Sequence, residues 1–346
     1  MVDEICEFED KTTGICKHIY SCTSAIDDLK QRKYPKTCGF DGFIPIICCP
    51  ERSNKLPDEE ERKVQNQNFG KVSSEMCKSY SGLVFQNHSS PLLLPGVLFD
   101  IEDTCVIKQQ NYRESNVLAR EFPHLVSIGY DLRRYKVWKC AGALISEKYV
   151  LTAATCHNLP TLGVAKYVRV GSTSVRENFY HEKPLQYFEI EEFIKHPEFN
   201  QRRLLHNIAL VKLNSSVKFT SIVRPACLGI NKAQPREAIN VGWGTLNTDN
   251  FMNNEPLKSL IKIIHRQSCN NIRENQFCVE QVPGTVWQNC LMDQGSPLQV
   301  YSDDDYCMYN IIGILFSWDN CNLYNRGTYT NATAYIPWIE KIVWEI

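Results

Sequence analysis

The sequence lacks an excess of charge of either sign, because 38 Lys and Arg residues nearly offset 39 Asp and Glu residues, leaving a net charge of -1. It contains no long Lys/Arg block, so composition gives no reason to expect nucleic acid or an acidic partner. No apolar run approaches the roughly 20 residues that a bilayer-spanning helix needs. We therefore expect no nucleic-acid partner and no membrane span.

Internal repeats and a glycine-rich phosphate loop are also missing, and the 16 cysteines do not form two CxxC pairs at zinc-ribbon spacing. We accordingly expect no cofactor and no metal ion. So many cysteines are hard to explain in a reducing cytosol, and they favour a secreted, extracellular protein. The triplets at Asn87, Asn214 and Asn331 agree weakly and are candidate N-glycosylation sites.

A signal segment is missing as well, since Met1-Val2-Asp3-Glu4 starts no charged and then apolar run. The expectation is a mature form or an incomplete gene model of a secreted protein.

Residues 6–49 form a dense cysteine block. So short a segment cannot bury enough core by itself, which indicates a small module stapled by disulfides. Its last two cysteines are adjacent and must bond to different partners, but spacing alone does not choose among the pairings. The cysteines of the block are Cys6, Cys16, Cys22, Cys38, Cys48 and Cys49.

The polar stretch 51–68 is typical of a flexible linker, and we expect a linker or pro-region over residues 50–110. Short β-rich runs then recur between turn residues, which favours an all-β sandwich or a pair of barrels. Apolar residues at helical spacing after Pro337 predict a C-terminal helix. The β-rich runs are 137–145, 167–171, 188–194, 208–213, 239–243, 296–301 and 309–316.

Eight segments, taken in order, resemble those of trypsin-like serine proteases. They are Glu121-Phe122-Pro123-His124, Ala141-Gly142-Ala143-Leu144-Ile145, Val150-Leu151-Thr152-Ala153-Ala154-Thr155-Cys156, Asn207-Ile208-Ala209-Leu210, Gly242-Trp243-Gly244, Cys290-x-x-Asp293-x-Gly295-x-Pro297-Leu298, Ser317-Trp318 and Gly327-x-Tyr329-Thr330. The resemblance implies two antiparallel β-barrels with a C-terminal helix, over residues 111–346.

The block 6–49 resembles the clip domain of arthropod proteases, including its terminal Cys-Cys pair. Cys77-Lys78-Ser79-Tyr80 and the extra Cys307 are most similar to the snake/persephone type. The clip resemblance implies the disulfides Cys6–Cys48, Cys16–Cys38 and Cys22–Cys49. In the large domain the resemblance implies Cys140–Cys156, Cys269–Cys278, Cys290–Cys321 and Cys105–Cys227, which leaves Cys77–Cys307.

The family's catalytic positions are all altered in this chain. Thr155 stands where the base histidine is expected, and a threonine does not titrate near neutral pH. Asn207 replaces the orienting aspartate, a change that costs about 10⁴ in turnover in such proteases. Gln294 replaces the serine and has no comparable nucleophilic oxygen. His157 and Ser296 lie nearby, but we expect both to face elsewhere, His157 as a surface histidine and Ser296 as a structural residue.

Other positions of the resemblance depart as well. Met292 stands at a glycine whose N–H contributes to the oxyanion hole, and Gln288 replaces the specificity-pocket aspartate. Asp319 stands where the family usually has glycine. The activation site falls at 111–114 and would provide no apolar new terminus, although Lys108 and Arg113 leave room for an off-register cut. Asp293, the usual partner of that terminus, must then find other hydrogen-bond partners or stay solvated.

The resemblance therefore implies a non-catalytic protease homologue that binds proteins in an extracellular cascade such as melanisation or Toll-type signalling. Clip-domain proteases, prophenoloxidase-like zymogens or cascade substrates in haemolymph are the expected partners. Two alternatives remain at this point. One is a serine endopeptidase with residual or unusual activity, and the other is a redundant structural product.

Overall fold

A computed structural model describes residues 4–8, 12–18, 22, 35–41, 44–50, 70–89, 99–106, 117–133, 135–171, 185–229, 235–244, 255–269, 272–273, 275–282, 293–318 and 326–345. Two compact units make up the chain, Met1–Gln67 and Asn68–Ile346. The expected linker 51–68 lies outside the described residues. Within those residues, no helix has the length and apolar character that crossing a bilayer demands.

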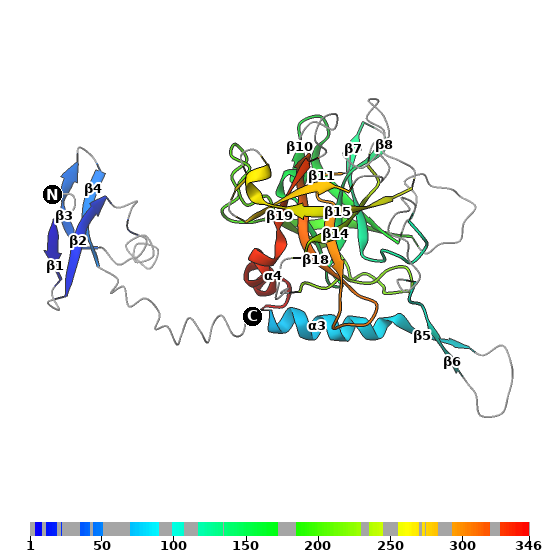
Figure 1. The fold of residues 1–346 in the computed structure, drawn as a ribbon. Coiled ribbons are helices and arrows are strands. Elements are labelled where there is room, and N and C mark those ends of the chain that lie inside the picture. Colours follow the sequence, from blue (N-terminus) through cyan, green and yellow to red (C-terminus); the bar gives the residue numbers. More distant parts are fainter. Residues whose placement is uncertain are drawn as a thin grey trace. The chain divides into compact units, whose positions relative to one another are not determined.

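The first unit contains a four-stranded antiparallel sheet in the order β1-β2-β4-β3, drawn in blue in Figure 1. Three disulfides join its strands and loop, and they are the pairs that the clip resemblance implies: Cys6–Cys48, Cys16–Cys38 and Cys22–Cys49. Successive residues of a strand point to opposite faces, so adjacent Cys48 and Cys49 reach different partners. The strands are β1 Ile5–Glu7, β2 Thr13–His18, β3 Thr37–Asp41 and β4 Ile44–Pro50.

The second unit begins its large domain with a closed barrel of six antiparallel strands, in which β11 also pairs with β7 and the short β10 extends β11. Buried Val, Ile and Leu side chains from the strands fill it. The strands are β7 Leu125–Leu132, β8 Tyr135–Leu144, β9 Tyr149–Thr152, β10 Asn158–Leu159, β11 Gly163–Val170, β12 Gln186–Lys195 and β13 Ala209–Leu213.

A second closed barrel follows, with the strand order β14-β15-β16-β19-β18-β17. Helix α4, Ile336–Val343, starts with Pro337 in its first turn, and its buried Ile336 and Ile339 join the core of the first barrel. The expected pair of antiparallel barrels and the C-terminal helix are thus confirmed (Figure 1). The strands are β14 Glu237–Gly242, β15 Leu257–Ile264, β16 Gln276–Gln281, β17 Pro297–Tyr301, β18 Tyr309–Trp318 and β19 Arg326–Asn331.

The segment before the barrels is folded where the sequence suggested only a pro-region. Helix α3, Lys71–Ser81, buries Ser73, Cys77 and Tyr80, which share one helical face. The short helix η2, Gly82–Val84, leads into a hairpin of β5 Phe85–Ser89 and β6 Phe99–Asp103. Residues 70–89 and 99–106 therefore belong with the second unit as folded structure, and α3 lies beside α4 (Figure 1).

Two expected disulfides are wrong, because their partners are exchanged. The structure joins Cys77 to Cys227 and Cys105 to Cys307, where Cys105–Cys227 and Cys77–Cys307 were expected. The backbone N–H of Cys227 donates to the carbonyl of Tyr309, so Cys227 and Cys307 flank the same point of the second barrel. Helix α3 sets Cys77 against Cys227 and Met308, and this placement decides the exchange.

The remaining expected pairs of the large domain are Cys140–Cys156 and Cys269–Cys278, which the structure confirms, and Cys290–Cys321, which lies outside the described residues. No cysteine within the described residues is free.

Candidate functional site: the altered catalytic positions

Thr155 and Asn207 lie in direct contact and hydrogen-bond each other twice. The Thr155 backbone N–H donates to Asn207 Oδ1 at 2.9 Å, and Asn207 Nδ2 donates to Thr155 Oγ1 at 3.3 Å. Thr155 belongs to the short helix η4, Ala154–His157, and Asn207 is buried just before β13. Two positions that are 52 residues apart are thus brought together as the family resemblance implies. Neither side chain titrates near neutral pH, so the pair offers no proton acceptor of the imidazole kind.

Gln294 is fixed through its backbone beside the same pair. Its carbonyl accepts the Ala141 N–H at 2.9 Å, and it forms a parallel bridge with Cys140. Because Cys140 is bonded to Cys156, the residue after Thr155, the disulfide ties the Gln294 turn to the Thr155 turn. The Gln294 side chain is exposed, so an uncharged amide occupies the nucleophile position at the surface.

Gly295 holds the turn after Gln294 in the left-handed region, with φ of 82°. A Cβ there would overlap Thr152 Oγ1 and the carbonyl oxygen of Ala141. Only glycine combines this φ with so close an approach of the backbone. The turn at which the resemblance places the nucleophile therefore keeps a left-handed backbone directly after Gln294.

The two neighbouring groups that could have substituted are packed away from the surface position of Gln294. His157 packs its ring against Phe193 of β12, with ring centroids 5.0 Å apart, and burial lowers the pKa of this histidine, followed by the charge of Lys195. Ser296 is fully buried, and its backbone bonds to Asp293 and Leu315. A buried hydroxyl cannot meet a substrate at the surface, which agrees with the structural role expected for Ser296. His157, expected at the surface, is half-buried.

Asp293 has found partners other than a new amino terminus. Its Oδ2 accepts the backbone N–H groups of Trp243 at 3.0 Å and Gly244 at 3.1 Å. Burial raises the pKa of this carboxyl from 3.8 to about 7, although both N–H groups and the charge of Lys139 oppose the shift. Burial thus favours the neutral form of this carboxyl, which is held by the backbone of the Gly242-Trp243-Gly244 segment.

Several predicted positions lie outside the described residues. They are Met292, Gln288, Asp319 and the activation segment with Lys108, Gln110 and Arg113. The Asn87 side chain also lies outside them, although its backbone in β5 pairs with Ile101 of β6. Asn214 is exposed after β13, whereas the half-buried Asn331 accepts from its own Thr333 hydroxyl at 2.7 Å. The exposed triplet therefore offers an accessible acceptor, and these sites stay predictions.

Sequence reasoning missed a cluster of aromatic rings at the loop that precedes Asn207. The imidazoles of His196 and His206 stack with centroids 5.1 Å apart, and Tyr335 and Trp338 of the C-terminal segment meet His196 edge-on. Burial lowers the pKa of His196, and a charge on His206 would lower it further. The charge of Glu198 acts in the other direction and raises it. Two histidines ten residues apart were the only sequence signal, and nothing pointed to Tyr335.

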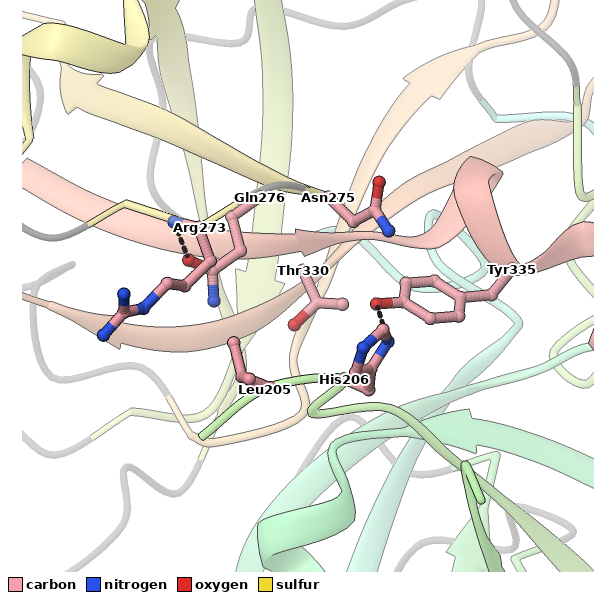
Figure 2. A pocket seen from close by; sticks show the side chains of 7 residues that line it. All are labelled: Leu205, His206, Arg273, Asn275, Gln276, Thr330 and Tyr335. Atoms are coloured by element: carbon pink, nitrogen blue, oxygen red, sulfur yellow. Dashed lines mark hydrogen bonds between the residues drawn. The ribbon is translucent and has the colours of Figure 1, made fainter. Parts of the chain in front are cut away.

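A small cavity of about 40 Å³ adjoins this cluster, and Figure 2 shows the side chains around it. Tyr335 and His206 meet at one end of it, while the Arg273 side chain points away from His206 (Figure 2). Thr330 Oγ1 donates to the Asn207 carbonyl at 3.2 Å, which connects the cavity wall to the altered catalytic positions. The lining residues are Leu205, His206, Arg273, Asn275, Gln276, Thr330 and Tyr335.

The two six-stranded barrels, with Thr155 in contact with Asn207 and with Gln294 tied through Cys140 to the turn that bears Thr155, define a fold of the trypsin type. A family model described as Trypsin matches residues 112–339, and the chain belongs to this family.

Individual relatives extend the similarity across the N-terminal unit. Serine protease snk of Drosophila melanogaster is 26% identical over 365 residues, which cover 97% of this chain and 77% of that protein. Phenoloxidase-activating factor 1 of Holotrichia diomphalia is 25% identical over 358 residues, which cover 94% of this chain and 88% of that protein. The crystal structure of the Drosophila Grass clip serine protease of the Toll pathway matches with a TM-score of 0.57 at 23% identity, covering 98% of this chain and 97% of that one. The last match shows the fold alone.

Proposed function

We propose that this chain is a non-catalytic serine protease homologue that regulates an extracellular proteolytic cascade by binding other proteins. The observation that carries the proposal is the hydrogen-bonded Thr155–Asn207 pair. It fills the place of base and orienting carboxylate with two uncharged groups that satisfy each other.

Peptide hydrolysis by this family requires a proton acceptor for the nucleophile and a carboxylate to stabilise the resulting imidazolium. Thr155 and Asn207 supply neither, and the exposed Gln294 amide is not a nucleophile of comparable basicity. Loss of such a triad costs about 10⁶ in turnover in a related protease. Binding is then the function that a retained surface can still perform.

The scaffold around the altered positions supports a binding role. Disulfides hold both units, and Gly295 gives the turn that bears Gln294 its left-handed backbone. The names of two relatives, Phenoloxidase-activating factor 1 and Serine protease snk, support a place among cascade proteins. The cysteine content supports secretion, with haemolymph as the compartment and a clip-domain protease, a prophenoloxidase-like zymogen or a cascade substrate as the partner.

The first test asks whether the chain has a reactive serine. Purified full-length protein is incubated with a fluorophosphonate probe beside an active clip-domain protease. We expect labelling of the active protease only. Stoichiometric labelling of this chain would contradict the proposal and would favour an unusual endopeptidase, the more so if Ser296→Ala abolished it.

The second test asks whether the chain changes a reaction that it does not perform. The rate at which a clip-domain protease activates a prophenoloxidase-like zymogen is measured with and without stoichiometric amounts of this protein. We expect the rate to change, and to change equally with the Gln294→Ala variant, because the effect does not depend on chemistry at that position. A rate that stays the same for each protease and zymogen pair tested, with no complex captured from immune-challenged haemolymph, would favour the redundant structural product.

A further inference from the structure

The loop between β12 and β13 brings three groups with metal-ligand chemistry together. His196 follows the last residue of β12, His206 precedes Asn207, and Glu198 lies on the loop between them. One ligand atom from each of the three side chains lies within 4.8 Å of the other two. Imidazole nitrogens with a carboxylate oxygen are ligands typical of zinc and similar divalent transition-metal ions.

Backbone hydrogen bonds fold this loop tightly. His196 N–H donates to the Ile208 carbonyl at 3.1 Å, and residues Asn200 and Leu205 pair with each other in both directions. Asn200 Oδ1 accepts the N–H groups of Arg202 and Arg203 at 3.0 and 2.9 Å. The two histidines are therefore held as neighbours by the loop itself, so binding an ion would order few additional residues.

His206 is oriented by a group outside the loop. Its Nδ1 lies 3.1 Å from the Tyr335 hydroxyl, and its Nε2 lies 3.8 Å from Glu198 Oε2 (Figure 2 shows the Tyr335 contact). A histidine that binds a metal through one nitrogen commonly donates the other N–H to an oxygen, which fixes the ring and its tautomer. Tyr335 is placed to accept that proton. The φ of 51° at His206 lies in the left-handed region, which is unusual for a residue other than glycine.

We propose that His196, Glu198 and His206 form a binding site for a divalent transition-metal ion, zinc being the ion that the ligand set fits best. Zinc binds imidazole nitrogen at about 2.0–2.1 Å, so the three ligand atoms must draw closer together than they lie now. Glu198 can supply much of that movement because its side chain is 71% exposed. The ion would tie both ends of the loop that leads into Asn207, whether or not the neighbouring surface has the binding role proposed above.

Two other groups of potential metal ligands in the described residues differ from the histidine cluster because they contain cysteines. Each contains disulfide-bonded cysteines, Cys6 with Cys38 and Cys48 in one and Cys77 with Cys227 in the other. A cysteine in a disulfide has no thiolate to bind an ion. Arg273 lines the cavity beside His206, but its side chain points away from that ring (Figure 2). The histidine cluster is therefore the group that retains its ligand atoms.

The test is a zinc titration of the metal-free full chain, by calorimetry and by thermal unfolding, after any purification tag has been removed. We expect one equivalent of zinc to bind and the melting temperature to rise with zinc concentration, because the folded state binds the ion preferentially. His196→Asn and His206→Asn should each weaken binding by at least about tenfold, and Tyr335→Phe by about tenfold as the positioning residue.

His265→Asn is the matched control. His265 Nδ1 accepts the Gln267 N–H at 3.4 Å, much as His196 Nδ1 accepts the Glu198 N–H at 3.3 Å, but His265 belongs to none of the clusters of potential ligands in the described residues. This variant should bind zinc as the wild type does. Glu198→Gln changes an exposed side chain and should weaken binding without lowering the metal-free melting temperature.

Two results would overturn the proposal. One is no zinc binding and no zinc-dependent melting temperature up to millimolar zinc. The other is binding whose affinity is the same in the wild type, Glu198→Gln and His206→Asn, since the ion would then occupy a different part of the chain.

Discussion

The Glu340 carboxylate of helix α4 accepts the backbone N–H of Ser73 at 2.8 Å, which links two helices 267 residues apart in the chain. Its other oxygen accepts the Gly70 N–H at 3.0 Å. These are N–H groups at the start of α3, which the helix itself cannot satisfy. The negative charge of this buried carboxylate also interacts favourably with the positive N-terminal end of the helix dipole. The last helix of the chain thereby caps the helix that precedes the barrels.

Glu340→Ala should destabilise the second unit by about 1–3 kcal/mol, because two N–H donors lose their acceptor where water is largely excluded. The loss should appear first as faster amide hydrogen exchange in α3. Glu75→Ala, an exposed carboxylate on α3 itself, is the control and should leave both quantities nearly unchanged. Equal effects of the two variants would mean that Glu340 is not the cap.

The raised pKa of Asp293 predicts a stability that falls as pH rises. The folded pKa of about 7 exceeds the ordinary 3.8, so between these values the folded state binds more protons than the unfolded state. The penalty is absent below about pH 4 and reaches at most about 4 kcal/mol above pH 7. Asp293→Asn removes the charge and keeps an oxygen for Trp243 and Gly244, so it should gain stability relative to the wild type from pH 5 to pH 8.

The measurement for Asp293 is the free energy of unfolding by denaturant at several pH values. Asp131→Asn is the contrasting control, since the hydrogen bond from Lys166 lowers the pKa of that exposed carboxyl. It should show no gain over the same range. A difference between wild type and Asp293→Asn that does not vary with pH would contradict the assigned pKa.

Gly295→Ala should cost about 2–5 kcal/mol of stability. The left-handed φ alone accounts for about 1–2 kcal/mol, and overlap with Thr152 and the Ala141 carbonyl adds about 1–3 kcal/mol. Gly163→Ala is the matched control, because Gly163 has a similar φ of 76° and open space where the Cβ would go. Thermal unfolding of both variants separates the backbone strain from the overlap, and equal losses would show that the overlap is relieved.

A double-mutant cycle at Thr155 and Asn207 tests whether the site still holds the geometry of a His–Asp pair. Asn207→Asp alone places a carboxylate in a buried position and should destabilise the fold by about 1–3 kcal/mol. Thr155→His in the same background supplies a partner, so the coupling energy should be favourable by about 0.5–3 kcal/mol. Additive single effects would indicate that an imidazole at residue 155 does not reach residue 207.

The exchanged disulfides predict which thiol each single substitution releases. Cys77→Ser should leave Cys227 free, and Cys105→Ser should leave Cys307 free. Each variant is folded, then unfolded without reduction and alkylated. Peptide mapping identifies the labelled cysteine. Label on Cys307 in the Cys77→Ser variant would instead support the Cys77–Cys307 pairing expected from sequence. Loss of either bridge should cost about 2–5 kcal/mol.

The barrels and the contact between Thr155 and Asn207 followed from the order of local motifs, because the fold that such motifs share fixes where each one lies. The cysteine exchange did not follow, since Cys227 and Cys307 flank the same Tyr309 and the sequence distances are equally compatible with both pairings. That choice depends on α3.

Long-range polar contacts were beyond the sequence for a similar reason. The buried pair of Lys258 and Glu121, with Nζ and Oε1 2.7 Å apart, joins residues 137 positions apart, and each looks like an ordinary surface charge in the sequence. The His196–His206 stack depends on the folding of an irregular loop, which has no period to read. Helix α3 could have been found, because Ser73, Cys77 and Tyr80 repeat at helical spacing.

The two bridges from the segment before the barrels have a consequence for any cut that the chain receives. Cys77 and Cys105 precede residues 106–139, and their partners Cys227 and Cys307 follow them. A protease that cleaves anywhere in that interval makes a two-chain molecule whose pieces stay joined twice over. On a non-reducing gel the nicked and the intact protein would have the same mass, and only reduction would separate them. Cleavage between residues 106 and 139 would therefore not release the N-terminal unit into the surrounding fluid.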